Sequence, residues 1–168
     1  MSDALVQDLL DFVKNRFFGK YRGVVVDVDA ATMRVKASVP SVLGGVTSGW
    51  AAPCVPYAGP QVGFLMLPDV GSGVWIEFEG GDVSFPIWTG CYWNSGDVPS
   101  AAAATLKTII VAAGSLAFDN GANSVTLQDS SQHSVALDSS GVTATAGAGS
   151  VAIGAAGVSL NNGALEVS

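Results

Sequence analysis

The last third of the chain, residues 124–168, is a short repeat and not an ordinary globular sequence. Strands of three to four residues, in which apolar positions alternate with small polar ones, are separated by Gly, Ser, Asn or Asp. Their spacing settles from an irregular start to nine and then seven residues. A unit this small cannot bury its own apolar edge, so we expect it to stack on copies of itself.

Stacking within one chain would still leave only two small apolar side chains in each layer and unpaired backbone groups along each edge. Several identical chains wound together remove both problems, and a threefold rod is the simplest closed arrangement. We therefore predict that the apolar residues at alternating positions of the segment 106–168 line the core of a trimer. They are Ile109, Val111, Leu116, Phe118, Val125, Leu127, Val135, Leu137, Val142, Val151, Ile153, Val158, Leu160, Leu165 and Val167.

Composition supports tight β-structure and argues against nucleic acid as a partner. Charged residues are 12% of the chain, hydrophobic residues are 49%, and there are 21 glycines, whereas disordered chains combine few apolar residues with high charge. The net charge is −7, and no Lys or Arg follows Lys107. An acidic rod has no electrostatic reason to bind nucleic acid or an anionic membrane.

Cys54 and Cys91 stand 37 positions apart without a paired spacing. We interpret them as buried thiols of a chain made in a reducing cytoplasm, with a disulfide as the alternative. The N-terminus lacks the pattern of a signal peptide, and the apolar run 101–118 is too rich in Ala and too short to span a bilayer. We expect the protein to reach its place of action by assembly or lysis.

The N-terminus is predicted to form an amphipathic helix that Ser2 caps and Gly19 ends. Its apolar stripe either packs on the chain's own domain or docks into a neighbouring subunit. The predicted docking residues are Leu5, Leu9, Val13 and Phe17.

From Lys20 the apolar period changes from the helical value to two, which indicates strands. Five or six short strands within about 75 residues, with no helical pattern between them, predict a small barrel of the OB kind. We expect Trp75 and Trp88 in its core, because both alternate correctly with their neighbours.

Five segments of this region resemble the OB domain of contractile-tail spike proteins: KYRGVVVDV, MRVKASVP, WAAPCVPYAG, GFLMLPDVGSGVWIEFEGGD and FPIWTGCYW. That family includes the baseplate assembly protein V of phages, the hub-spike proteins of type VI secretion, and the spikes of tailocins and extracellular contractile injection particles. The resemblance covers residues 19–93, and the repeat after it is similar to the family's triple-stranded β-helix needle.

The resemblance implies an all-β protein with an N-terminal helix (1–18), an OB-fold domain (19–93), a linker (94–105) and a C-terminal intertwined trimeric β-helix (106–168). It implies a structural central spike, assembled in the bacterial cytoplasm, that sits as a homotrimer on the baseplate hub of a virion or related particle and pierces the target cell envelope when the sheath contracts. The chain stops in mid-pattern with Leu165 and Val167 uncovered, so we also expect a tip protein of the PAAR-repeat kind. The sequence does not distinguish phage, tailocin and secretion system.

No catalytic constellation is evident, and we expect neither enzyme activity nor a cofactor. The single histidine, His133, lies far along the sequence from both cysteines, and Glu77 and Glu79 are interpreted as solvated strand acids. Some relatives carry a lysozyme domain after the barrel, where this chain has only a twelve-residue linker.

His133 lies two and four positions before Val135 and Leu137, so in a strand it would point to the same side as these predicted core residues. Three copies could then meet on the threefold axis and hold a metal, an anion or water. We favour the alternative, a histidine in the turn 130–134 that faces solvent. The family's His-x-His tip motif, which binds iron, has no counterpart here.

Two other classes of function remain open. One is a trimeric tail-fibre or adhesin segment, which the OB region argues against. The other is an OB-fold ligand-binding module with an oligomerising tail, in which the tryptophans would stack bases; the charge balance argues against it.

Overall fold

A computed structural model of the chain describes residues 3–161 and 163–167. Contacts divide the chain into two units, residues 1–98 and residues 99–168. Strand residues outnumber helical residues in both units, so the predicted all-β class is confirmed. Within the described residues, no helix is long and apolar enough to cross a membrane.

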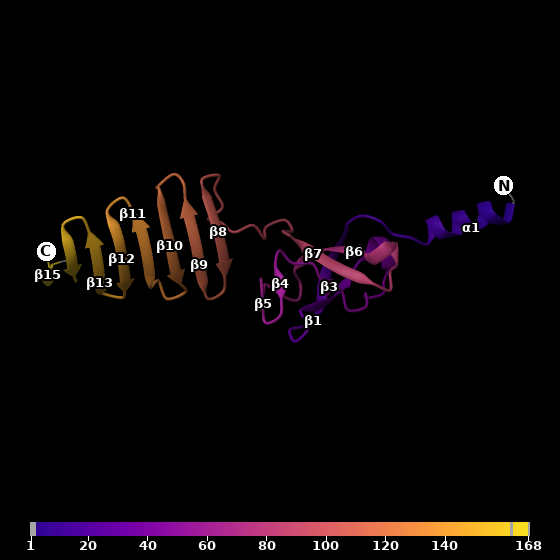
Figure 1. Cartoon of the computed structure of the whole chain (residues 1–168), viewed down its shortest axis with the longest axis horizontal. Coiled ribbons are helices and arrows are strands. Elements are labelled where there is room, and N and C mark those ends of the chain that lie inside the picture. Colours follow the sequence, from indigo (N-terminus) through magenta and orange to yellow (C-terminus); the bar gives the residue numbers. More distant parts are fainter. Residues whose placement is uncertain (1–2, 162, 168) are drawn as a thin grey trace. The chain divides into compact units, whose positions relative to one another are not determined.

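The first unit contains helix α1 and a five-stranded sheet in the order β2-β1-β6-β7-β3, with a separate hairpin of β4 and β5 (Figure 1). Strand pairs in the sheet are antiparallel, except that β3 runs parallel to β7. The elements are α1 (Asp3–Lys14), β1 (Tyr21–Asp29), β2 (Arg34–Ser38), α2 (Pro40–Leu43), β3 (Ala52–Pro53), β4 (Ala58–Gly59), β5 (Val62–Gly63), β6 (Gly73–Phe78), the 3-10 turn η1 (Glu79–Gly81) and β7 (Pro86–Tyr92).

This unit has a conventional hydrophobic core. Trp88 lies in it as predicted, and its indole Nε1 donates a hydrogen bond to the Met33 carbonyl oxygen at 3.0 Å. The other buried hydrophobic residues are Val25, Val35, Ala37, Val39, Ala51, Val74, Ile76 and Phe78.

Trp75 does not lie in the core, so that prediction is wrong. It alternates with the buried Val74 and Ile76 and therefore lies on the opposite face of β6. There its ring contacts Tyr92, with ring centroids 5.1 Å apart.

The prediction of buried cysteines is also wrong, since Cys54 and Cys91 are both free and exposed. Cys91 lies near the end of β7, where the pairing of β6 with β7 is irregular. Val74 pairs with Cys91 and Ile76 with Trp88, so β7 carries an extra residue and the parity of its side chains shifts.

Helix α1 ends at Lys14 and not at the predicted Gly19. Phe17 leaves the helical stripe because it finds partners on the barrel. Its backbone N–H donates to the Gly81 carbonyl oxygen at 2.8 Å, and its ring meets those of Tyr21 and Phe78 edge-on. An ion pair between Arg16 and Asp82, at 3.0 Å, also joins the segment after α1 to the barrel.

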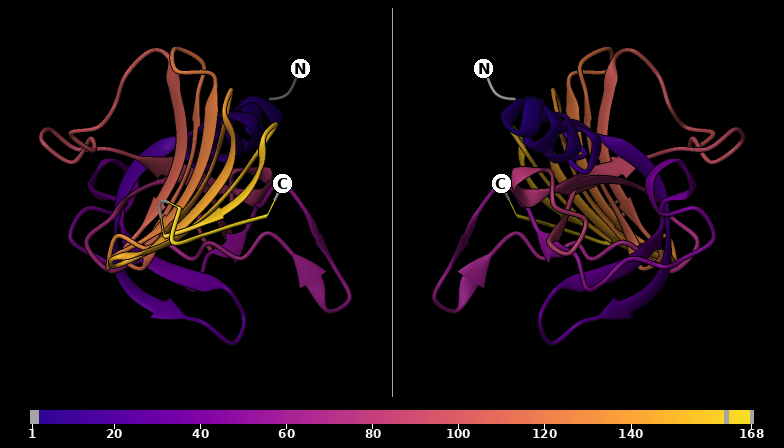
Figure 2. Two further views of the ribbon diagram at one scale, coloured as in Figure 1. Left: turned by 90° about the vertical axis from the view of Figure 1, so that its left-hand side faces the viewer. Right: turned by 90° about the vertical axis from the view of Figure 1, so that its right-hand side faces the viewer.

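The second unit is one eight-stranded antiparallel sheet in which each strand pairs with its neighbours in sequence (Figure 1). Viewed end-on in Figure 2, its strands lie one behind another. The strands are β8 (Leu106–Val111), β9 (Gly114–Asp119), β10 (Ser124–Asp129), β11 (Ser134–Asp138), β12 (Gly141–Ala146), β13 (Gly149–Gly154), β14 (Gly157–Leu160) and β15 (Leu165–Val167).

Most of these strands are longer than the predicted three to four residues; β10, for example, has six. The strands are longer because the small polar residues on either side of each apolar pair also form backbone hydrogen bonds with the neighbouring strand. Backbone groups are consequently paired within one chain, and β8 and β15 are the two edges of the sheet. The intertwining of three chains stays a prediction.

The turn at Gly141 generates the first testable prediction. Gly141 has φ +134°, and a Cβ there would collide with the Ile153 carbonyl oxygen of the paired strand. We expect Gly141→Ala to lower the free energy of unfolding by more than about 1 kcal/mol, measured by chemical denaturation. The matched control is Gly149→Ala in the same sheet, whose Cβ would have its nearest neighbour at 3.4 Å; equal stability of the two variants would contradict the described register.

Candidate functional site

One face of the C-terminal sheet carries two continuous rows of aliphatic side chains, which we call the apolar face. Cross-strand pairing aligns Phe118, Val125, Leu137, Val142, Ile153 and Val158 in the first row. The second row consists of Ile109, Leu116, Leu127, Val135, Ala144, Val151, Leu160 and Leu165.

The register therefore brings the predicted trimer-core residues onto one face of one sheet. Val111 shares the parity of Ile109 on β8. Val167 pairs with Val158 through the backbone, but its side chain lies outside the described residues.

The opposite face carries mostly small side chains. Its central row alternates hydroxyl and methyl groups from strand to strand, because the paired residues are Thr108, Ala117, Thr126, Ala136, Thr143, Ala152 and Ser159. The two faces therefore differ sharply in size and polarity, and the sheet is amphipathic.

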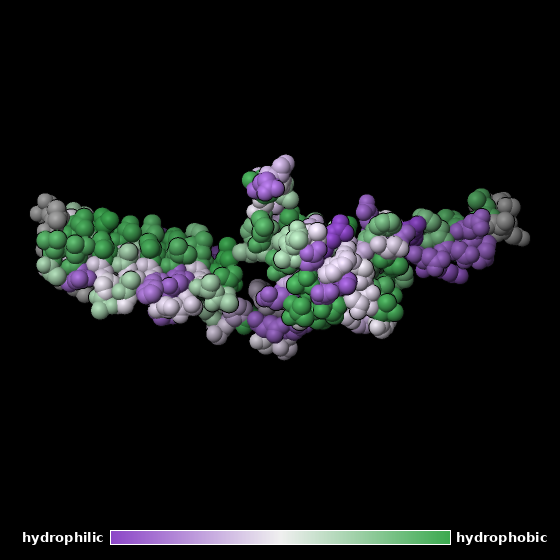
Figure 3. Space-filling model, turned by 90° about the horizontal axis from the view of Figure 1, so that it is seen from below, coloured by the Kyte–Doolittle hydropathy of each residue, from purple (hydrophilic) through white to green (hydrophobic). Residues whose placement is uncertain are grey.

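The apolar face is uncovered in a single chain. Leu127 is 58% exposed and Ile153 is 52% exposed, and every fully buried hydrophobic residue of the described chain lies in the first unit. In Figure 3 the C-terminal sheet, at the left, shows a continuous green apolar band beside a purple and white zone. A contiguous apolar surface of this kind marks an interaction site.

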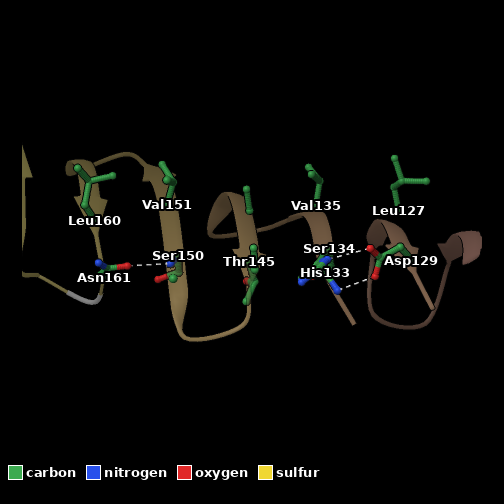
Figure 4. A pocket seen from close by; sticks show the side chains of 13 residues that line it. Leu127, Asp129, His133, Ser134, Val135, Thr145, Ser150, Val151, Leu160 and Asn161 are labelled. Carbon is green, nitrogen blue, oxygen red and sulfur yellow. Dashed lines mark hydrogen bonds and ion pairs between the residues drawn. The ribbon is translucent and has the colours of Figure 1, made fainter. Parts of the chain in front are cut away.

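The close-up in Figure 4 shows the same arrangement around a hollow on this face. The side chains of Leu127, Val135, Val151 and Leu160 point to the same side, and all of them come from a single sheet. Within the described part of the chain, no second layer closes the hollow, so a complete core requires atoms from another molecule.

His133 lies at the border of this hollow, in the turn before β11. Its Nδ1 lies 2.8 Å from Oδ2 of Asp129, and the imidazole is about half exposed. Oδ1 of Asp129 accepts the backbone N–H groups of Ser131 and His133 at 2.8 and 2.9 Å. The favoured solvent-facing turn and the axial alternative both stay predictions, because the alternative needs three chains. The described residues of one chain contain no group of three or more metal-ligating side chains.

Glu77 and Glu79 do not form a carboxylate pair. Glu77 lies on β6 and its Oε1 is 2.7 Å from Nζ of Lys20, whereas Glu79 begins the 3-10 turn η1.

The sequence analysis missed an aromatic cluster with a cation on the first unit. The Arg22 guanidinium lies 5.6 Å from the ring centroid of Trp75 and 5.3 Å from that of Tyr92. The alternation of side chains along the two strands could have indicated this cluster, because β1 and β6 are paired at Arg22 and Trp75.

Aspartates in the turns of the C-terminal sheet are expected to make the stability of the protein depend on pH. Hydrogen bonds hold the pKa of Asp129 and Asp138 below their usual value of 3.8, first through the backbone N–H of His133 and the Ser140 hydroxyl respectively. Because the folded pKa is lowered, this stabilisation is present above the unfolded pKa and is lost as the pH falls through the folded pKa.

We therefore expect the melting temperature of the protein to fall when the pH is lowered below about 4, followed by circular dichroism. In the variant Asp129→Asn/Asp138→Asn the amides keep an acceptor but do not titrate, so the fall should be smaller. An equal fall in both proteins would show that these turns do not contribute.

Comparison with protein families supports the same division of the chain. Residues 21–93 match the type VI secretion system/phage-baseplate injector OB domain, and residues 102–166 match the phage baseplate V C-terminal trimerisation domain. No curated protein sequence matches the chain. The C-terminal match shows self-association as a trimer, and the two matches together show a structural, particle-associated baseplate role. The chain belongs to the family of phage baseplate V and type VI secretion hub-spike proteins.

Proposed function

We propose that the protein is the central spike of a contractile injection system. In this proposal three chains form a homotrimer on the baseplate hub, and their C-terminal sheets form a needle that pierces the target cell envelope on sheath contraction. The observation that carries it is the apolar face, which is uncovered in one chain and belongs to a region that matches a trimerisation domain.

Three copies of the sheet close a core if each turns its apolar face to a common threefold axis. Each chain then contributes two aliphatic rows, and the Thr, Ala and Ser residues of the opposite face form the outside. Burying a Leu or Ile stabilises by about 1.5–3 kcal/mol, so each half-exposed side chain contributes on the order of 1 kcal/mol. The sum over both rows and three chains favours a stable rod.

The sheet is suited to a mechanical role. Its hydrogen bonds run from strand to strand, and therefore along the direction in which the strands are stacked. A load along that direction compresses the ladder and presses neighbouring strands together, whereas unfolding requires the strands to separate. A dry apolar core in the trimer further opposes local opening.

Two adjacent residues test the inward face. Val142 lies on the apolar face and Thr143 on the opposite face of the same strand. We expect Val142→Asp to dissociate the trimer, because three buried like charges each cost several kcal/mol unless neutralised. Thr143→Asp should remain trimeric.

Molar mass by light scattering distinguishes the two results. A trimeric Val142→Asp variant would show that this face does not form the core, and a monomeric unmutated protein would overturn the proposed function.

The hub is the proposed partner of α1. The helix has twelve residues, and isolated helices of this length are marginal in water. Leu5, Leu9 and Val13 are all exposed on it, so its stripe is free to enter a groove. Phe17, which packs on the barrel, lies outside this stripe.

Leu9→Asp is expected to leave the trimer intact and to reduce incorporation of the protein into particles at least tenfold, because a charge would be buried in the groove. Lys14→Gln on the same helix is the control. Normal amounts of Leu9→Asp protein in purified particles, quantified by immunoblotting, would show that α1 does not dock on the hub.

A tip protein of the PAAR-repeat kind remains part of the proposal. Strand β15 has β14 as its partner in the described sheet, and its Leu165 is exposed. A tip protein that pairs with β15 would cover both the edge of the sheet and the Leu165 side chain. Electron microscopy of intact particles tests for additional density beyond β15.

A further inference from the structure

The first unit carries an exposed apolar segment that neither its own core nor the proposed needle explains. Residues 56–66, which we call the arm, contain the hairpin of β4 and β5 and no charged residue. Leu65 is 71% exposed and Tyr57 is 59% exposed, and Val62, Phe64 and Met66 are exposed as well. Five large apolar side chains on one short segment exceed the scattered exposure that is normal for a monomer.

The arm is weakly supported within its own chain. Its strands have two residues each, joined by the pairs Ala58 with Gly63 and Gly59 with Val62. A two-stranded hairpin alone is marginally stable in water. A hollow separates the arm from the turn between β1 and β2, which includes Met33. The arm therefore requires cover from outside.

A second surface of the same unit offers a hollow with an aromatic wall, which we call the aromatic hollow. It has a volume of about 530 Å³. Its lining combines apolar and aromatic side chains with two carboxylates and consists of Leu67, Pro68, Asp69, Ser72, Gly73, Cys91, Tyr92, Trp93 and Asp97. Trp93 is 67% exposed. Tyr92 is held in place by a hydrogen bond from its hydroxyl to the Gly23 carbonyl oxygen at 3.1 Å. A rigid aromatic wall beside an exposed Trp is typical of an anchor site in a protein interface.

A second copy of this chain is the occupant that these observations favour. The trimer attaches three first units to one rod through residues 94–105, a segment that spans at most about 40 Å when fully extended. Such a tether gives a local concentration on the order of millimolar. Each chain carries a net charge of −7, and the aromatic hollow itself includes Asp69 and Asp97. Like charges repel, so a segment that packs there must itself carry no carboxylate, and the arm has no charged residue.

We propose that the arm of each first unit packs into the aromatic hollow of the next copy in the trimer. The contact is head-to-tail, and threefold rotation closes it into a ring without free arms. The proposal rests on the proposed trimer. It adds a second locking site to the trimer, at the barrels, that is independent of the apolar face of the needle.

Cysteine accessibility in the full chain tests this contact. In a Cys54→Ser/Cys91→Ser background, Leu65→Cys on the arm is compared with Val46→Cys, a 69% exposed position outside the arm. Reaction rates with a soluble maleimide are measured on protein whose trimeric mass has been established by light scattering. We expect Leu65→Cys to react at least tenfold more slowly than Val46→Cys.

Two further variants show what covers the arm. Adding Val142→Asp, which separates the chains, should raise the Leu65→Cys rate to that of Val46→Cys. Trp93→Ala should also raise it while the protein stays trimeric, and Trp93→Phe should restore protection.

Several outcomes overturn the proposal while the trimer stands. Fast labelling of Leu65→Cys in the trimer would mean that the arm is free or covered by a different protein in the particle. Protection that persists in the separated chains would mean that the arm folds onto its own barrel. Protection that Trp93→Ala leaves unchanged would place the arm elsewhere than in the aromatic hollow. A monomeric mass of the unmutated protein would instead remove the proposed function, and the arm contact with it.

Discussion

The structure depends on a conflict between strand pairing and burial in the C-terminal sheet. Antiparallel pairing of neighbouring strands satisfies the backbone within one chain, and the same register puts two rows of large apolar side chains on one face. One sheet has no second layer with which to cover that face. Association is therefore required by the geometry of the sheet, and the trimerisation domain that matches residues 102–166 supplies it.

The two units solve the problem of burial differently. The OB unit closes around its own core, in which Val35 and Ile76 are fully buried and the Trp88 indole is hydrogen bonded. The second unit has no such core among its described residues. The first unit therefore buries apolar surface within one chain, whereas the second unit buries it only on association with other chains.

Alternation along the chain predicted the fold class and a set of residues that share one face of the C-terminal sheet, because side chains change face at every residue of a strand. It was less successful at deciding which face of a strand in the first unit is buried. Cys91, beside an irregular pairing of β6 with β7, is exposed, and Trp75 lies on the outer face although its spacing is regular. Phe17 left the helical stripe because it pairs with Phe78, which is distant in sequence.

The sequence by itself determined that the last third forms repeated strands with one apolar face and that the region before it forms an OB barrel, since both follow from local periodicity and residue type. Only the tertiary structure decided that the C-terminal strands form a single meandering ladder within one chain, and which face of the barrel each aromatic residue occupies. The arm and the aromatic hollow likewise became visible only when exposure was known. Such features depend on pairing between distant residues, on which local periodicity carries no information.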